Sequence, residues 1–126
     1  GFNAGFEHRW TLKILGGEVS PWKWCGMLAS HVMDARKGAS GKDDQERGSG
    51  TTGLKFQAFV RLGMPDYNGH LEEFLKPPHK GGEKPGTNDP NRIDDIKLDI
   101  LLKYCGIDAI LEWEVAQQQM AEMGTL

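Results

Sequence analysis

The sequence predicts an α/β chain that is mostly helical, with one or two short strands on its N-terminal side. Three observations lead to this prediction. Apolar residues recur at helical spacing in several segments, one short aromatic segment suits a strand, and two stretches rich in Gly, Ser or Pro suit loops. Helices of this kind bury their apolar faces against a sheet or against one another.

The N-terminal third combines two predicted helices with a predicted strand. The first helix carries apolar side chains one turn apart and ends at a glycine pair; these residues are Phe6, Trp10, Ile14 and then Gly16-Gly17. Residues 18–24, EVSPWKW, fit a brief strand that places Trp22 and Trp24 on one side. Residues 26–36 repeat apolar side chains at helical spacing and predict the second helix.

The remaining segments are predicted helices separated by loops. Residues 37–53 and 77–92 lack helical periodicity and predict loops, the second with a modest positive charge. Residues 54–64 predict a helix that ends at Gly63, and residues 65–76 predict a turn and a short helix. The strongest helical signal covers residues 92–124, although Gly106 weakens an unbroken helix there by about 1 kcal/mol. Its apolar stripe comprises Ile96, Ile100, Leu101, Tyr104, Ile107, Asp108, Leu111 and Val115.

The composition is typical of a globular chain outside the membrane. The 126 residues suffice for one domain, and 38% are hydrophobic and 26% charged. No apolar run reaches the length of a membrane span. The two cysteines, Cys25 and Cys105, are too few for a disulfide scaffold and have no zinc-ligand spacing, which favours reduced thiols in the cytoplasm. The net charge of −3 neither predicts nor excludes a nucleic-acid partner.

Two pairs of residues could carry chemistry, and each also has an ordinary structural interpretation. Tyr104 and Asp108 lie one helical turn apart, so both side chains share a face. A carboxylate among apolar residues needs a partner or a metal ion, but Asp108 could lie at the edge of the stripe and Tyr104 in the core. Asn3 and Glu7 are also four residues apart, and there Asn3 could cap a helix while Glu7 faces the helix dipole.

Taken together and in order, these motifs resemble the DEDD 3′–5′ exonucleases. FNAGFEHRW resembles the second exonuclease motif, in which an Asn precedes an acidic metal ligand by four residues. YCGIDA resembles the third motif of the tyrosine subgroup, Tyr-x-x-x-Asp. WKWCGMLASHVMD and GLKFQAFVRLGMPDY resemble the segments between them. The chain is thus similar to the proofreading domain of family A, phage-type DNA polymerases over nearly its whole length.

This resemblance implies a ribonuclease H-like exonuclease fold, of which residues 1–126 would form the mostly helical C-terminal part of one domain. The sequence begins with Gly in the middle of a pattern, and we expect an upstream segment to carry the main sheet strands and the first motif, Asp-x-Glu. The family usually has Asp where this chain has Glu7, and Asp-Thr-Met where it has Cys25-Gly26-Met27. The first departure affects the geometry of a ligand, and the second affects local stability.

The resemblance also implies a two-metal mechanism with Mg²⁺ or Mn²⁺ held by four carboxylates. Asp108 and Glu7 would supply two of the four ligands, and Tyr104 would orient the attacking water. Asn3 and Phe6 would shape the site or touch the terminal nucleotide. The substrate would be the 3′ end of single-stranded DNA, in the cytoplasm of a bacterial or phage-infected cell, with a possible polymerase domain in the parent chain. The chain alone would be inactive or nearly so.

Two alternatives remain open at this point. The chain could be a catalytically dead structural or interaction module associated with a DNA polymerase. It could also be an unrelated helical binding protein whose motifs arose by chance, in which case Glu7 and Asp108 would lie on distant faces.

Overall fold

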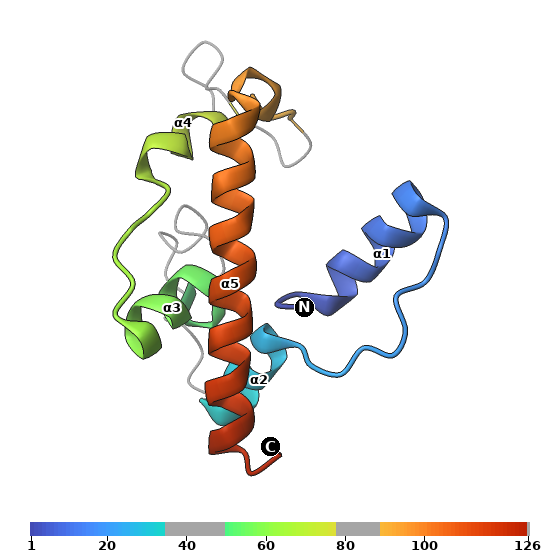
Figure 1. Cartoon of the computed structure of the whole chain (residues 1–126), viewed down its shortest axis with the longest axis vertical. Helices are drawn as coiled ribbons and strands as arrows, with labels where there is room; N and C mark the ends of the chain where they lie inside the picture. Colours follow the sequence, from blue (N-terminus) through green and yellow to red (C-terminus); the bar gives the residue numbers. More distant parts are fainter. Residues whose placement is uncertain (35–49, 78–88, 126) are drawn as a thin grey trace. The chain divides into compact units, whose positions relative to one another are not determined.

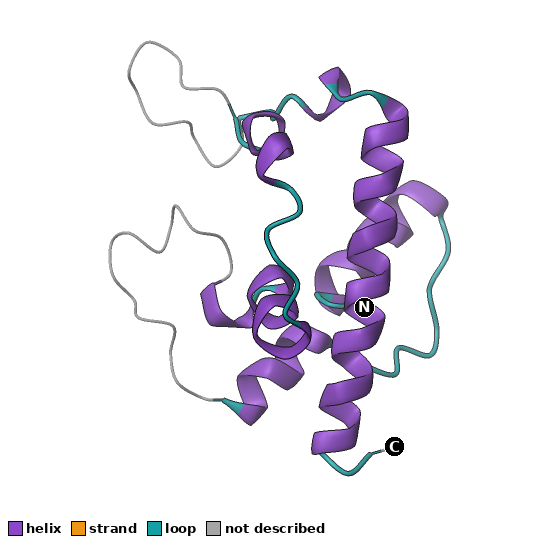
Figure 2. Ribbon diagram, turned by 60° about the vertical axis from the view of Figure 1, so that its left-hand side comes forward, coloured by secondary structure: helices purple, strands orange, loops and turns teal. Residues whose placement is uncertain are grey.

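The computed structural model describes residues 1–34, 50–77 and 89–125, and all regular structure in these residues is helical (Figures 1 and 2). They group into two compact units, one of Gly1–Met64 with Asp108–Leu126 and one of Pro65–Ile107. The long helix α5, Leu98–Glu122, contributes to both units. A single exonuclease domain over residues 1–126 stays a prediction.

The first helix of the first unit, α1, is confirmed and spans Ala4–Leu15. It ends at Gly16, whose φ of 66° is in the left-handed region that glycine adopts without strain. No residue of α1 is buried, whereas Phe2, just before the helix, is buried. The helix is therefore attached mainly through the residues that precede and follow it.

The predicted strand over residues 18–24 is wrong. This segment has no regular structure, because a strand requires a ladder of backbone hydrogen bonds to a neighbour and none forms here among the described residues. Instead, the chain start pairs with the beginning of α2, Gly26–Met33. The Gly26 amide donates to the Gly1 carbonyl at 3.1 Å, and the Met27 amide donates to the Phe2 carbonyl at 2.8 Å.

The third helix, α3, spans Leu54–Leu62 and confirms the predicted helix that ends at Gly63. Gly63 has a φ of 65° and donates its amide to Phe59, while the Met64 amide donates to Ala58. These two bonds satisfy carbonyls at the helix end, and the bond from Gly63 to Phe59 is that of an αL motif. Residues 37–49 of the first predicted loop lie outside the described residues, and Gly50–Thr52 forms a 3-10 turn, η1, rather than a loop.

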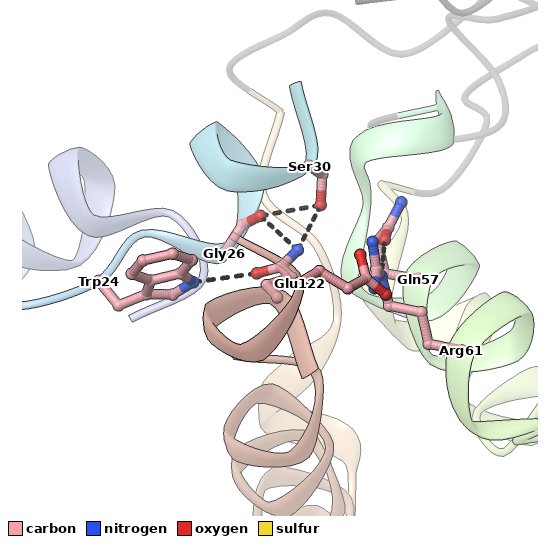
Figure 3. A network of polar contacts seen from close by, with 7 residues as sticks. Trp24, Gly26, Ser30, Gln57, Arg61 and Glu122 are labelled. Carbon is pink, nitrogen blue, oxygen red and sulfur yellow. Dashed lines mark hydrogen bonds and ion pairs between the residues drawn. The ribbon is translucent and has the colours of Figure 1, made fainter. Parts of the chain in front are cut away.

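A fully buried glutamine ties α5 to α2 in the first unit (Figure 3). The Gln119 amide donates to the Gly26 carbonyl at 3.1 Å and to the Ser30 hydroxyl at 2.8 Å, and its Oε1 accepts from the Trp24 indole at 3.0 Å. A second set of polar contacts ties α3 to the end of α5 through Arg61, which donates to Gln57 and Glu122. Buried polar atoms of this unit are thus paired across elements.

The second unit contains short helices and the beginning of α5. The 3-10 turn η2, Gly69–Leu71, leads into α4, Glu72–Leu75, and a further 3-10 turn, η3, covers Ile93–Asp95. Arg92 joins α4 to η3, because its amide donates to the Phe74 carbonyl at 2.9 Å and its guanidinium lies 5.1 Å from the Phe74 ring centroid. Residues 78–88 of the second predicted loop lie outside the described residues, and 89–92 have no regular structure.

The predicted C-terminal helix is confirmed over α5, which continues through Gly106 without a break, but residues 92–97 of the prediction lie before α5 and include the 3-10 turn η3. Most of the predicted stripe is buried or half-buried, and the buried face extends further to Ala116 and Gln119. Ile100 is the exception, with 37% of its surface exposed. The helical period therefore identified which face of α5 is buried, but the predicted stripe stopped before the C-terminal end of that face.

Candidate functional site

The Tyr104 and Asp108 side chains extend from consecutive turns of α5. Both residues are half-buried and belong to one continuous helix, so the spacing of four residues places them on one face as predicted. Gly106 lies between them, and a Cβ at this position would meet nothing within 4 Å. Because the helix is unbroken between the two residues, the Tyr104 phenol and the Asp108 carboxylate extend from neighbouring turns of the same face.

An aromatic neighbour lies beside Tyr104. The ring centroids of Tyr67 and Tyr104 are 6.1 Å apart, and their planes are inclined by 32°. Tyr67 precedes η2 and is itself half-buried. Tyr67 was not predicted from the sequence as a site residue, because a contact between residues so far apart leaves no periodic signal.

The Glu7 side chain caps the N-terminus of α1. Its Oε1 accepts the backbone amides of Phe2 at 3.2 Å and Asn3 at 3.4 Å, which resembles the reciprocal part of a capping box. Within the described residues, Oε2 of Glu7 makes no hydrogen bond to the protein. Glu7 therefore acts as a cap through Oε1, while Oε2 lies next to Gly1.

Asn3 and Phe6 take different positions at the same helix end. Asn3 is the residue before α1, and its carbonyl accepts the amides of Phe6 and Glu7, but its side chain forms no capping bond. The Phe6 ring is 53% exposed and lies 6.1 Å from the ring of Trp10, whose face is covered by the Lys13 ammonium at 5.3 Å. The role of Asn3 and Phe6 in substrate binding stays a prediction.

Acidic side chains of α1 and α5 approach the same residue, Gly1. Oε1 of Glu112 lies 3.1 Å from the Gly1 nitrogen, and a Cβ at Gly1 would collide with the Glu7 carboxylate. Glu112 follows Asp108 by one turn of α5, so it shares that face. Glu112 was not predicted from the sequence as a site residue, although its spacing of four residues from Asp108 was the available signal.

The described residues contain no group of three or more His, Cys, Asp or Glu side chains placed to hold a metal ion. Asp108 and Glu7 provide the oxygen donors that Mg²⁺ and Mn²⁺ prefer, but a complete set of ligands is not assembled among these residues. The donor type fits the predicted cofactor, and the number of donors in this part of the chain does not suffice for it.

No protein-family model, curated protein sequence or solved structure matches this chain. The exonuclease resemblance accordingly rests on the sequence motifs quoted above. Among the described helices, none has the length and apolar character needed to cross a membrane.

Proposed function

We propose that this chain is part of a 3′–5′ exonuclease of the tyrosine DEDD subgroup, which removes nucleotides from DNA 3′ ends in proofreading. The observation that carries the proposal is the pairing of Tyr104 and Asp108 on one half-buried face of the unbroken helix α5. The ordered sequence motifs, a ribonuclease H-like fold completed by further strands, and a cytoplasmic location belong to the same proposal.

Each proposed site residue would have a distinct task. Asp108 and Glu7 would offer carboxylate oxygens to divalent ions, which when bound activate water and stabilise charge on the attacked phosphate. The Tyr104 hydroxyl would hold the attacking water by a hydrogen bond and orient it toward the phosphorus. The Phe6 ring, exposed next to Glu7, would contact the terminal nucleotide, and Asn3 would shape the helix end. Two further carboxylates would come from the Asp-x-Glu segment that the resemblance implies.

Manganese binding measured by calorimetry tests this proposal on the chain as it is. The comparison is between the wild type, Asp108→Asn and a control, Asp99→Asn, whose carboxylate lies exposed in the first turn of α5. We expect weak binding in the wild type, because only part of the ligand set is present, and a strong loss in Asp108→Asn alone. Equal binding by all three proteins, or no binding by any, would remove the support for a metal site at Asp108.

A non-catalytic module beside a DNA polymerase is the second candidate. It is favoured by the capping bonds of Glu7, which give this carboxylate a structural task, and by the incomplete ligand set of the described residues. In that case the folded chain would bind no manganese, and the same calorimetric series would select this candidate.

A further inference from the structure

Tyr67 and Tyr104 are the two tyrosines of the sequence, and they form a ring pair within the second unit. Their centroid separation of 6.1 Å lies inside the range of about 4.5–7 Å in which aromatic pairs attract one another. Both residues are half-buried, so the pair is partly shielded from water. One side of the Tyr104 ring therefore has a defined neighbour that does not come from its own helix.

Tyr67 is held by the turn that contains it. Oδ1 of Asp66 accepts the Asn68 amide at 3.1 Å, which closes an Asx-turn with Tyr67 at its centre. Asn68 is only 2% exposed, and its carbonyl accepts the amide of the equally buried Leu71 at 2.7 Å. These bonds hold the backbone on both sides of Tyr67, and so fix the point from which its side chain extends toward Tyr104.

We propose that Tyr67 is a positioning residue, whose ring selects the rotamer of Tyr104 and so sets the direction of the Tyr104 hydroxyl. The consequence for catalysis rests on the proposed function, in which this hydroxyl orients the attacking water. An orienting group must be held within about 0.5 Å of its productive position, and such residues depend on packing neighbours that lock their rotamers. Tyr67 would supply this packing from outside α5 without touching the substrate.

Fluorine NMR of the full chain labelled with 3-fluorotyrosine tests the positioning directly. Tyr67→Phe retains the ring and leaves a single fluorine signal, that of Tyr104, whereas Tyr67→Leu leaves the same signal without the neighbouring ring. We expect the Tyr104 signal to keep its dispersed position in Tyr67→Phe and to shift toward its unfolded-chain position in Tyr67→Leu. Circular dichroism of each variant verifies that its helix content is that of the wild type.

A second pair of variants tests the same inference without altering either ring. Asp66→Asn keeps a side-chain oxygen that can accept the Asn68 amide, and Asp66→Ala removes it. We expect the Tyr104 signal to move in Asp66→Ala and to be retained in Asp66→Asn. This pair decides the question if Tyr67→Leu does not fold. A Tyr104 signal that is the same in both members of each folded pair would overturn the inference.

Addition of Mn²⁺ to the labelled proteins separates this inference from the proposed function. If Asp108 binds the ion, the fluorine signal of Tyr104 should broaden in the wild type and in Tyr67→Phe. In Tyr67→Leu this broadening should be smaller. If Tyr67 has only a structural role, the Tyr104 signal of a folded Tyr67→Leu protein should broaden as much as that of the wild type. This result would overturn the positioning role. Absence of broadening in the wild type would count against the metal site, while the fluorine shifts would still decide whether Tyr67 orients Tyr104.

Discussion

Replacement of Gln119 should destabilise the first unit more than any other single change to a polar side chain of α5. Gln119 is fully buried, and its amide joins Trp24, Gly26 and Ser30 through three hydrogen bonds (Figure 3). Gln119→Ala removes all three bonds and leaves a space where the amide lay. Gln119→Met removes the bonds but keeps a side chain of similar length, so the two variants separate hydrogen bonding from packing.

The magnitude follows from what each partner loses. Three net hydrogen bonds of about 1 kcal/mol each give roughly 3 kcal/mol. The Ser30 hydroxyl keeps its own bond to the Gly26 carbonyl at 2.8 Å, so neither of these groups becomes unpaired. The Trp24 indole loses its acceptor, and the space left by the shortened side chain adds about 1 kcal/mol. We therefore expect a loss of about 3–5 kcal/mol for Gln119→Ala and about 2–4 kcal/mol for Gln119→Met.

Urea unfolding followed by circular dichroism and tryptophan fluorescence measures these losses. Gln118→Ala is the matched control, because Gln118 is the same residue type one position earlier on α5 and is only half-buried. Its replacement should change the free energy of unfolding by less than about 0.5 kcal/mol. The reasoning is refuted if Gln119→Met is as stable as the wild type, or if Gln118→Ala loses as much stability as Gln119→Ala.

Two glycines and one ion pair give further predictions, all measurable by urea unfolding. Gly106→Ala should stabilise the chain by about 0.5–1 kcal/mol, because a Cβ in the middle of α5 meets nothing; Gly63→Ala should destabilise it by about 1 kcal/mol, because φ there is 65°. A Gly106→Ala protein less stable than the wild type, or a Gly63→Ala protein more stable than the wild type, would contradict the assigned backbone. Glu122→Gln should cost less than about 1 kcal/mol, and less still in high salt, because Glu122 is exposed. Arg61→Met should cost more, since it also loses the bond to Gln57.

The helices were predictable because their information is local. A period of 3.6 residues and terminal glycines located α1, α3 and α5, and the cap at Gly63 was placed at the correct residue. The strand over residues 18–24 failed because a strand is defined by its partner, which residue types alone do not specify. Gln119 was missed because a polar residue was not expected on a buried face, although it lies one turn after Val115.

The candidate site was predictable only where its residues share one helix. Tyr104 and Asp108 were paired from their spacing, and this spacing holds in α5. Tyr67 reaches Tyr104 from a distant turn, and Glu112 meets Gly1 through folding, so neither contact is a local property of the sequence. Glu7 had two interpretations from the start, as a residue at a helix N-terminus and as a metal ligand.

These two interpretations of Glu7 are compatible, because they use different oxygens and different properties of the side chain. Capping uses Oε1 and needs only an acceptor, whereas metal binding needs negative charge and would use the other oxygen. Glu7→Gln should therefore keep α1, losing about 0.3–1 kcal/mol from the helix dipole, while manganese binding is lost. Glu7→Ala should lose the cap as well, which amide hydrogen exchange would detect as fraying of α1, a helix with no buried residue to hold it. Manganese binding by Glu7→Gln equal to that of the wild type would leave Glu7 as a cap alone and would place the second ligand elsewhere, with Glu112 the next residue to replace.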